Sequence, residues 1–142
     1  MVIPPCEGFW LIGAEVWSPM GVEGVVVPVS ATNDKPLQGF SFGSVFPIQH
    51  ARLAEINLEG TVTEQVGADV FVVEIWNGGP EDPQDALGWG TCSVILDFEP
   101  PLEGRVIPPG VGQRIANLVY DILPPVGERP EEHLRSVRRL PR

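Results

Sequence analysis

Short runs of alternating apolar and polar residues recur along most of the chain, and each run ends at glycine, proline, asparagine or aspartate. Alternation with a period of two places one set of side chains in a core and the other in water. The pattern therefore predicts antiparallel β-strands. The clearest runs are EGVVVPVS from Glu23, LQGFSFGSVF from Leu37, ADVFVVEIW from Ala68, TCSVILDF from Thr91 and RIANLVYDIL from Arg114.

Seven to nine strands are expected, without a clear helix in the body of the chain. Strands of this number close into two packed sheets, so the sequence predicts an all-β, antiparallel β-sandwich. The region Leu53–Thr63, broken at Gly60, is the weakest of the predicted strands. The others are Phe9–Trp17, Glu23–Ser30, Leu37–Phe46, Asp69–Trp76, Trp89–Phe98, Arg105–Ile107 and Arg114–Leu123.

The same alternation predicts which side chains face the core. Phe40, Phe42 and Phe46 share one face of their strand, with Ser41 opposite. Pro28 cannot donate a hydrogen bond to a neighbouring strand, so its strand should lie at a sheet edge or carry a bulge there. Phe71, Val73 and Ile75 share one face of a later strand, and the inward-facing residues expected in the strand after it are Cys92, Val94, Leu96 and Phe98.

The chain has 142 residues, a length that fits one domain. Its charged residues are distributed unevenly along the sequence. Residues 1–128 hold 17 acidic and four basic residues, a net charge of −13, whereas the last 14 residues add five arginines and two glutamates. An acidic body repels nucleic-acid backbones and anionic membranes, so neither is an expected partner. The sequence contains no run of 18 apolar residues, so it predicts no membrane-spanning helix.

Two segments resemble cohesin-type modules. GVEGVVVPVSATNDKPLQGFSFGSVFP (Gly21–Pro47) resembles their opening: a glycine, a Val-x-Val-Pro-Val strand, an asparagine-containing turn and a strand with an aromatic-rich face. VIPPGVGQRIANLVYDI (Val106–Ile122) is similar to a strand near the end of related bacterial modules. The resemblance implies a non-catalytic, jelly-roll sandwich that binds a protein partner in extracellular or cell-surface complexes. Some carbohydrate-binding modules share that architecture.

The resemblance covers about residues 10–123 and divides the chain into an N-terminal arm (1–8), a cohesin-like β-sandwich (9–123) and a Pro/Arg-rich tail (124–142). Cohesins have a further strand where this tail stands, and the tail is expected to be a short helix or disordered instead. A sandwich without its last strand leaves a sheet edge open to another strand. A neighbouring subunit could fill it with its arm, Met1–Trp10; alternatively, the domain tolerates the loss.

The start of the chain, MVIPPCEGFWLIG, lacks the basic segment and long apolar core of a signal peptide. The protein is then cytosolic, processed or a fragment. The acidic composition is typical of soluble secreted or surface proteins. Together with the resemblance, it favours an extracellular or cell-surface location.

Trp76 and Trp89 flank the longest loop and are the candidate ligand-binding residues. Their planar rings could lie near each other and stack on sugar rings. The alternative is that each is a large core residue with a polar handle. The expected functions are therefore a module for protein–protein assembly, with a protein partner or copies of itself, or a module that binds polysaccharide.

Other candidate sites carry weaker signals. Cys6 and Cys92 could form a disulfide, or both could be free thiols. The loop residues Glu81, Asp82 and Asp85 could hold calcium, although a solvated turn is the stronger interpretation. No other metal or cofactor is expected, because the cysteines and histidines lack metal-ligand spacing.

Residues 39–43 match the G-x-S-x-G string of serine hydrolases, with Ser41 at its centre. That motif requires a strand, a sharp turn and then a helix. Here the string lies inside an alternating strand, and only His50 and His133 could serve as a base. The sequence therefore predicts that the protein is not an enzyme.

Overall fold

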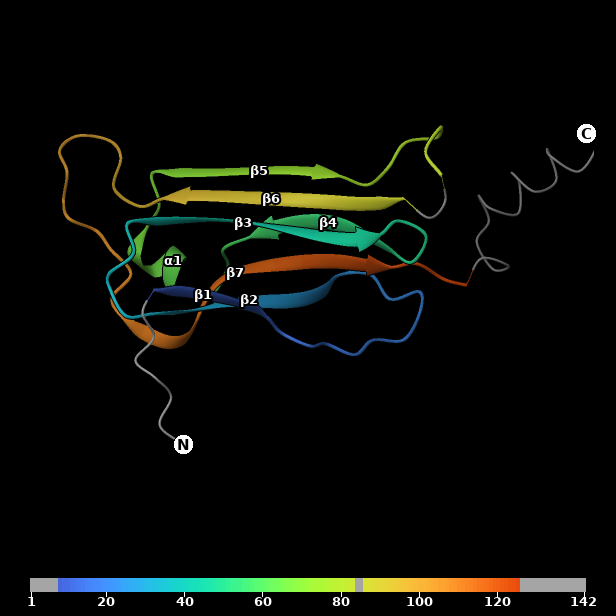
Figure 1. Ribbon diagram of the computed structural model, residues 1–142, viewed down its shortest axis with the longest axis horizontal. Helices are drawn as coiled ribbons and strands as arrows, with labels where there is room; N and C mark the ends of the chain where they lie inside the picture. The colour runs from blue at the N-terminus through green and yellow to red at the C-terminus, as the bar shows by residue number, and fades with distance from the viewer. Residues whose placement is uncertain (1–7, 84–85, 126–142) are drawn as a thin grey trace, which may run out of the picture.

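The computed structural model describes residues 8–83 and 86–125, which form seven β-strands and one short helix (Figure 1). The predicted tail lies almost entirely outside the described residues, as does most of the predicted arm. The elements are β1 (Phe9–Gly13), β2 (Val25–Asn33), β3 (Gly39–Pro47), β4 (Ala51–Asn57), α1 (Val62–Val66), β5 (Val70–Trp76), β6 (Leu87–Ile95) and β7 (Gly110–Ile122).

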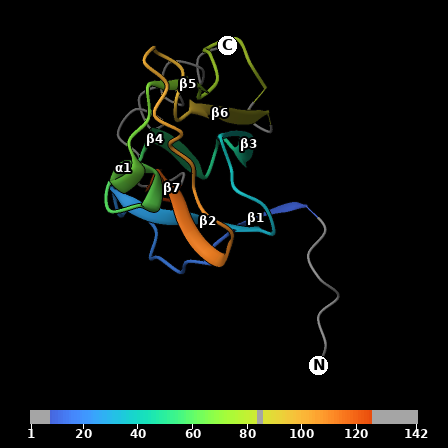
Figure 2. The ribbon, with the colours of Figure 1, turned by 90° about the vertical axis from the view of Figure 1, so that its left-hand side faces the viewer.

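The strands form two antiparallel sheets, as the alternation predicted. One sheet has four strands in the order β1-β2-β7-β4, and the other has three in the order β3-β6-β5. Viewed from the end, the four-stranded sheet lies below the three-stranded one, with β4 between them on one side (Figure 2). Neighbours in a sheet are mostly not neighbours in sequence, so non-local pairing holds this fold together.

The core consists of the inward-facing residues of both sheets. Phe40 and Phe46 are buried as predicted, and Phe42 is partly buried against the same cluster. The buried residues of β2, β3 and β6 lie at alternate positions, where period-two alternation placed them. The buried apolar cluster comprises Val29, Ala31, Phe40, Phe46, Leu53, Ile56, Cys92, Val94, Leu96, Ile107, Ile115, Ala116 and Leu118.

Pro28 is accommodated in an interior strand. Strand β2 lies between β1 and β7, with a register shift between Val29 and Ser30 instead of at Pro28 itself. The carbonyl of Pro28 accepts a hydrogen bond from the N–H of Ala14 at 2.9 Å, one residue beyond the end of β1. The missing N–H of Pro28 therefore faces a position where the neighbouring strand has already ended.

The second half of the predicted strand region Leu53–Thr63 is wrong, because a helix begins there. Thr61 caps α1: its hydroxyl accepts a hydrogen bond from the N–H of Glu64 at 3.2 Å. The Thr63 hydroxyl donates to the carbonyl of Ile115 at 2.8 Å and fixes the helix to β7. Five residues are too few for a stable isolated helix, so tertiary contacts must maintain it.

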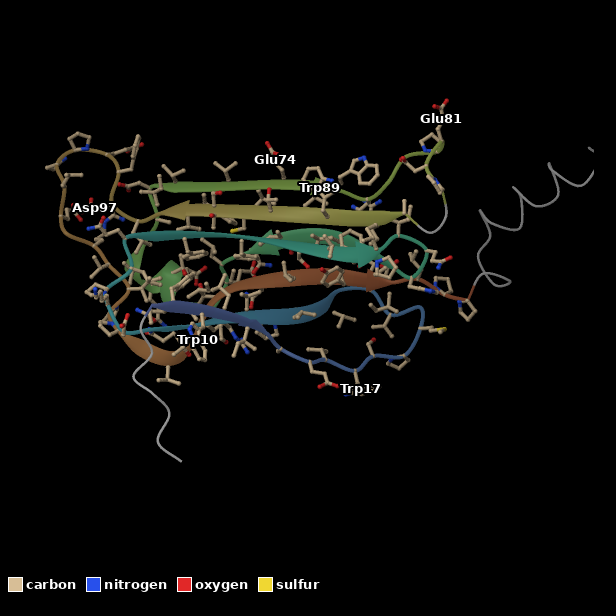
Figure 3. The ribbon with its side chains drawn as sticks, viewed as in Figure 1. Trp10, Trp17, Glu74, Glu81, Trp89 and Asp97 are labelled. Carbon is tan, nitrogen blue, oxygen red and sulfur yellow. The ribbon has the colours of Figure 1, made fainter. Side chains whose placement is uncertain are left out.

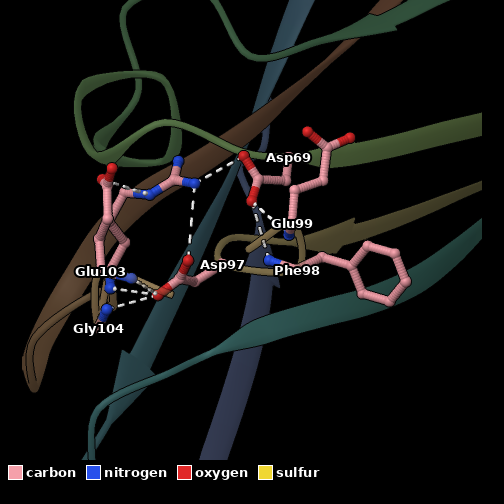
Figure 4. A network of polar contacts seen from close by, with 7 residues as sticks. Asp69, Asp97, Phe98, Glu99, Glu103 and Gly104 are labelled. Carbon is pink, nitrogen blue, oxygen red and sulfur yellow. Dashed lines mark hydrogen bonds and ion pairs between the residues drawn. The ribbon is translucent and has the colours of Figure 1, made fainter. Parts of the chain in front are cut away.

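The prediction that Phe98 faces the core is also wrong. Strand β6 ends at Ile95, and Phe98 is 61% exposed. The carboxylate of Asp69 accepts hydrogen bonds from the N–H groups of Phe98 at 2.9 Å and Glu99 at 3.0 Å (Figure 4). These bonds hold the chain in a bend where the alternation would have continued the strand.

Candidate functional site

Four strand edges bound the two sheets, and they fall on two sides of the molecule. The edges of β4 and β5, called here the closed side, contact each other. The edges of β1 and β3, called here the open side, lie on the opposite side in the end-on view (Figure 2). An unpaired edge is a template for another strand, so the protection of each edge decides where another chain can pair.

The edge of β4 is sealed by a side chain. Asn77 accepts a hydrogen bond from the N–H of Leu53 at 2.8 Å and donates one to the Leu53 carbonyl at 3.0 Å. A register shift between Leu53 and Glu55 interrupts the strand, and the exposed Arg52 and Glu55 flank it. A capping amide, a bulge and charged residues all discourage strand addition.

The edge strand β5 is protected by charge. Glu74 lies near its centre, is exposed, and points away from the body of the molecule (Figure 3). A strand that pairs with β5 must approach this carboxylate.

Strand β3 has none of these protections. It spans nine residues, GFSFGSVFP, without a charged side chain, and it pairs with β6 in an unbroken register. The Leu96 N–H donates to the Gln38 carbonyl at 2.9 Å, which assigns the backbone groups of even-numbered β3 residues to β6. The odd-numbered residues therefore direct their N–H and C=O groups to the open edge.

One residue already pairs with the outer side of this strand at its N-terminal end. Leu37 and Ile107 exchange two backbone hydrogen bonds, each 2.9 Å long, in an antiparallel bridge. Beyond that bridge, no strand of the described part of the chain pairs with the outer edge of β3.

Strand β1 is short and uncharged, and apolar side chains surround it. Trp10 and Ile12 are exposed on the outer face of the four-stranded sheet, and Trp17 in the following loop is 87% exposed. Trp10 and Trp17 project from the same side of the molecule (Figure 3). The open side thus combines unprotected backbone with exposed apolar surface.

Trp76 and Trp89 are direct cross-strand partners between β5 and β6, so the prediction that they lie near each other is confirmed. Trp89 is also opposite Val45 of β3, and the three side chains form one row on the outer face of the three-stranded sheet. Trp89 is 38% exposed and Trp76 is partly buried. Neither is a core residue between the sheets.

Cys92 faces the core of the molecule. Cys92 is fully buried and has no disulfide partner among the described residues, and burial raises the pKa of its thiol to about 11. Cys6 lies outside the described residues, so the Cys6–Cys92 disulfide stays a prediction.

The predicted calcium loop folds as a turn. One carboxylate oxygen of Asp82 accepts a hydrogen bond from the Gly79 N–H at 2.6 Å, and Glu81 points outward at the tip of the loop (Figure 3). Asp85 lies outside the described residues. Within residues 8–83 and 86–125, no group of three or more His, Cys, Asp or Glu side chains is arranged to hold a metal.

The G-x-S-x-G string is part of a continuous strand. Ser41 lies in the middle of β3 opposite Ser93, and the strand continues to Pro47 without the sharp turn of a nucleophile elbow. His50 is exposed in the turn that follows, and His133 is outside the described residues.

Sequence reasoning missed a polar network that organises the loop between β6 and β7. The Arg105 guanidinium donates to Asp69 at 2.6 Å and lies 3.8 Å from Asp97 (Figure 4). Hydrogen bonds from Arg105 and from the N–H groups of Glu99 and Phe98 lower the pKa of Asp69 to about 2. The contacts of Arg105 with Asp69, Asp97 and Glu103 raise its already high pKa, the contact with Asp69 most.

The second carboxylate of the network, Asp97, holds the far end of the same loop. Its Oδ2 accepts hydrogen bonds from three consecutive N–H groups, those of Glu103, Gly104 and Arg105. The loop then leads to Ile107, which pairs with β3. The only sequence signal was the rarity of basic residues before residue 128, which makes Arg105 a conspicuous partner for surrounding acids.

A comparison with protein-family models, curated proteins and solved structures finds no match to this chain. The resemblance to cohesin-type modules therefore remains an expectation from the sequence. Among the described residues, no helix has the length and apolar composition that crossing a membrane requires.

Proposed function

We propose that this protein is a non-catalytic module for protein–protein assembly, in which copies of the chain join through their open sides in a surface scaffold, an adhesion or a filament. The proposal includes a cohesin-like jelly-roll sandwich without its final strand, and an extracellular or cell-surface location. The single observation that carries it is the unequal protection of the four edges.

The inequality matters because proteins normally protect their sheet edges. This chain does so on the closed side with the Asn77 amide, a bulge and three charged residues. On the open side, β3 is longer than β4 or β5 and carries no charge. An edge of this kind is suited to strand addition, in which backbone hydrogen bonds supply affinity.

The pairing of β1 limits which residues of the arm could take part in strand exchange. Phe9 and Trp10 belong to β1 and pair with Asn33 and Thr32 of the same chain. The arm that could cross to a neighbour without opening β1 is therefore shorter than Met1–Trp10 and ends before Phe9.

The assembly function is tested by measuring molar mass over a wide range of protein concentration, with light scattering after size exclusion and with sedimentation velocity. The expected result is a mass that rises with concentration, with dimers or longer assemblies at the upper end. Negative-stain images would distinguish closed oligomers from fibres. A monomer at every concentration would overturn the proposal.

A second candidate function is carbohydrate binding, and the cross-strand placement of Trp76 and Trp89 favours it. Two indole rings on adjacent strands of an outer sheet face can contact the apolar C–H surface of a sugar. Binding to a glycan array that Trp89→Ala abolishes would support this function. Trp17→Ala is the matched control, because Trp17 is exposed in a loop away from this sheet.

If both variants bind glycans as the wild type does, the aromatic pair is not a sugar site.

A further inference from the structure

We infer that β3 pairs antiparallel with β3 of a second copy of the chain, across a two-fold axis near Phe42. The pairing joins two three-stranded sheets into one continuous sheet of six strands. This inference rests on the proposed assembly function and specifies its contact. It makes the interface isologous, so the same residues serve both subunits.

The backbone of β3 is ready to form such a pair. Gly39, Ser41, Gly43 and Val45 direct N–H and C=O groups to the open edge, since the alternating even-numbered residues bond to β6. Their side chains lie on the outer face and are small, and Val45 is 68% exposed. Nothing bulky on these residues prevents a second strand from approaching to hydrogen-bonding distance.

The register follows from what limits the edge at each end. Ile107 already bonds to Leu37, so pairing can begin no earlier than Gly39. Pro47 is also an odd-numbered residue, and its missing N–H would face the same edge. The usable window is therefore Gly39–Val45, whose centre is Phe42.

An antiparallel pair centred on this window places Gly39 opposite Val45 and Ser41 opposite Gly43 of the second copy. The two Phe42 side chains then meet at the axis on the inner face. Phe42 is partly exposed, whereas Phe40 and Phe46 on the same face are buried. Contact between the two rings would remove this remaining exposure, and close aromatic cross-strand pairs stabilise sheets.

Charge favours a second copy as the occupant. Because β3 is uncharged, two copies place no like charges opposite each other. Self-pairing of β5 would bring two Glu74 carboxylates into one small interface, and Asn77 blocks β4. The acidic bodies still repel each other at long range, and salt screens that repulsion. Dimerisation through β3 should therefore become stronger as the salt concentration rises. Binding of a basic partner would become weaker, because salt would screen its attraction to the acidic body.

The decisive variant is Ser41→Pro. Its proline removes an N–H that faces the open edge and costs no hydrogen bond to β6, but it blocks an incoming strand. The second variant, Ser41→Lys, adds a charge to the same position and keeps the N–H. Its matched control is Val72→Lys, because Ser41 and Val72 pair with Ser93 from opposite sides on the same face.

We expect both Ser41 variants to weaken dimerisation by about tenfold or more, since the two-fold axis repeats each loss in both copies. Val72→Lys should leave it nearly unchanged. Sedimentation velocity measures the dimer dissociation constant of each protein at about 0.02 M and about 0.5 M salt. The wild type should dimerise more strongly at the higher salt concentration. Circular dichroism confirms folding; if Ser41→Pro does not fold, Ser41→Lys carries the test.

Amide hydrogen exchange gives an independent measurement. In the wild type, exchange at Gly39, Ser41, Gly43 and Val45 should slow as concentration rises, while Phe40 and Phe42 are protected at every concentration. Oligomers that persist in both Ser41 variants would overturn the β3 pairing but leave the assembly function standing. A wild type that is always monomeric overturns both. Slow exchange at the odd-numbered residues in a monomer would mean that the chain covers its own edge, and would also overturn the pairing.

Discussion

The closed and open sides of the molecule both consist of antiparallel strands with an apolar inner face, but the edges of their outer strands are protected differently. On the closed side the Asn77 amide satisfies the backbone of Leu53, and Glu74 adds charge to β5. On the open side only the Leu37–Ile107 bridge engages the outer edge of β3 among the described residues. We therefore expect stability and the proposed assembly to depend on different sides, and variants can separate the two.

The largest expected effect comes from removing core packing on the closed side. Leu53 of β4 is fully buried, so Leu53→Ala should lower the free energy of unfolding by about 2–5 kcal/mol. Leu11 of β1 is only partly buried, and Leu11→Ala should cost about 1–2 kcal/mol. Urea unfolding of both variants measures the difference. Equal losses would show that the two sides are packed equally well.

The next effect is the loss of the Asn77 cap. Asn77→Ala leaves the N–H and C=O of Leu53 without their partner, which should cost about 1–3 kcal/mol. Asn77→Asp is the control, because it keeps the acceptor and loses the donor, and it should fall between wild type and Asn77→Ala. Thermal unfolding of the three proteins measures the order. If Asn77→Ala is as stable as wild type, the amide does not seal the edge of β4.

A smaller effect should appear as a pH dependence of stability. The pKa of Asp69 is about 2 in the folded protein against a usual value of 3.8, mainly because of the hydrogen bond from Arg105. The unfolded chain therefore binds this proton first as pH falls, and protonation favours unfolding. The contribution of Asp69 is complete above about pH 4 and is lost towards pH 2.

Asp69→Asn removes this titration and should flatten the stability profile between those pH values, measured by thermal unfolding at each pH. The same variant should speed amide exchange at Ile107, because the network holds the loop that brings Ile107 to β3. Asp34→Asn is a control on an exposed carboxylate without such a network. An unchanged acid slope in Asp69→Asn would assign the pH dependence to other carboxylates.

The smallest expected effect is chemical and leaves stability unchanged. Because burial keeps the Cys92 thiol protonated at pH 8, it should react slowly with a thiol reagent in the native protein. Counting thiols in denaturant without reductant then decides the status of Cys6. Two reactive thiols would exclude the disulfide, and none would establish it. Rapid native labelling of Cys92 would contradict its burial between the two sheets.

Much of the fold could be predicted because the period of a strand is local. The alternation in GFSFGSVFP and in TCSVILDF correctly placed Phe40, Phe46, Cys92, Val94 and Leu96 in the core. It failed at Phe98, where the Asp69 carboxylate from a distant part of the sequence bends the chain. It also missed α1, although Thr61 and Glu64 have the spacing of a helix cap.

The candidate site was less predictable. The sequence placed Trp76 and Trp89 on either side of one loop, and a hairpin-like pairing of β5 with β6 makes them cross-strand partners. The Asp69–Arg105–Asp97 network had no spacing motif, because its members come from three separate segments. Likewise, nothing in the sequence near Asn77 indicates that its amide will bond to the backbone of Leu53.

The sequence by itself determined that the chain forms antiparallel strands, which face of each strand is apolar, and that residues 39–47 carry no charge. Only the tertiary structure decided that this uncharged strand lies at a sheet edge while the equally uncharged β2 lies in the interior. The reason is physical. Side-chain alternation is fixed within a strand, whereas the order of strands in a sheet depends on hydrogen bonds between residues far apart in the chain.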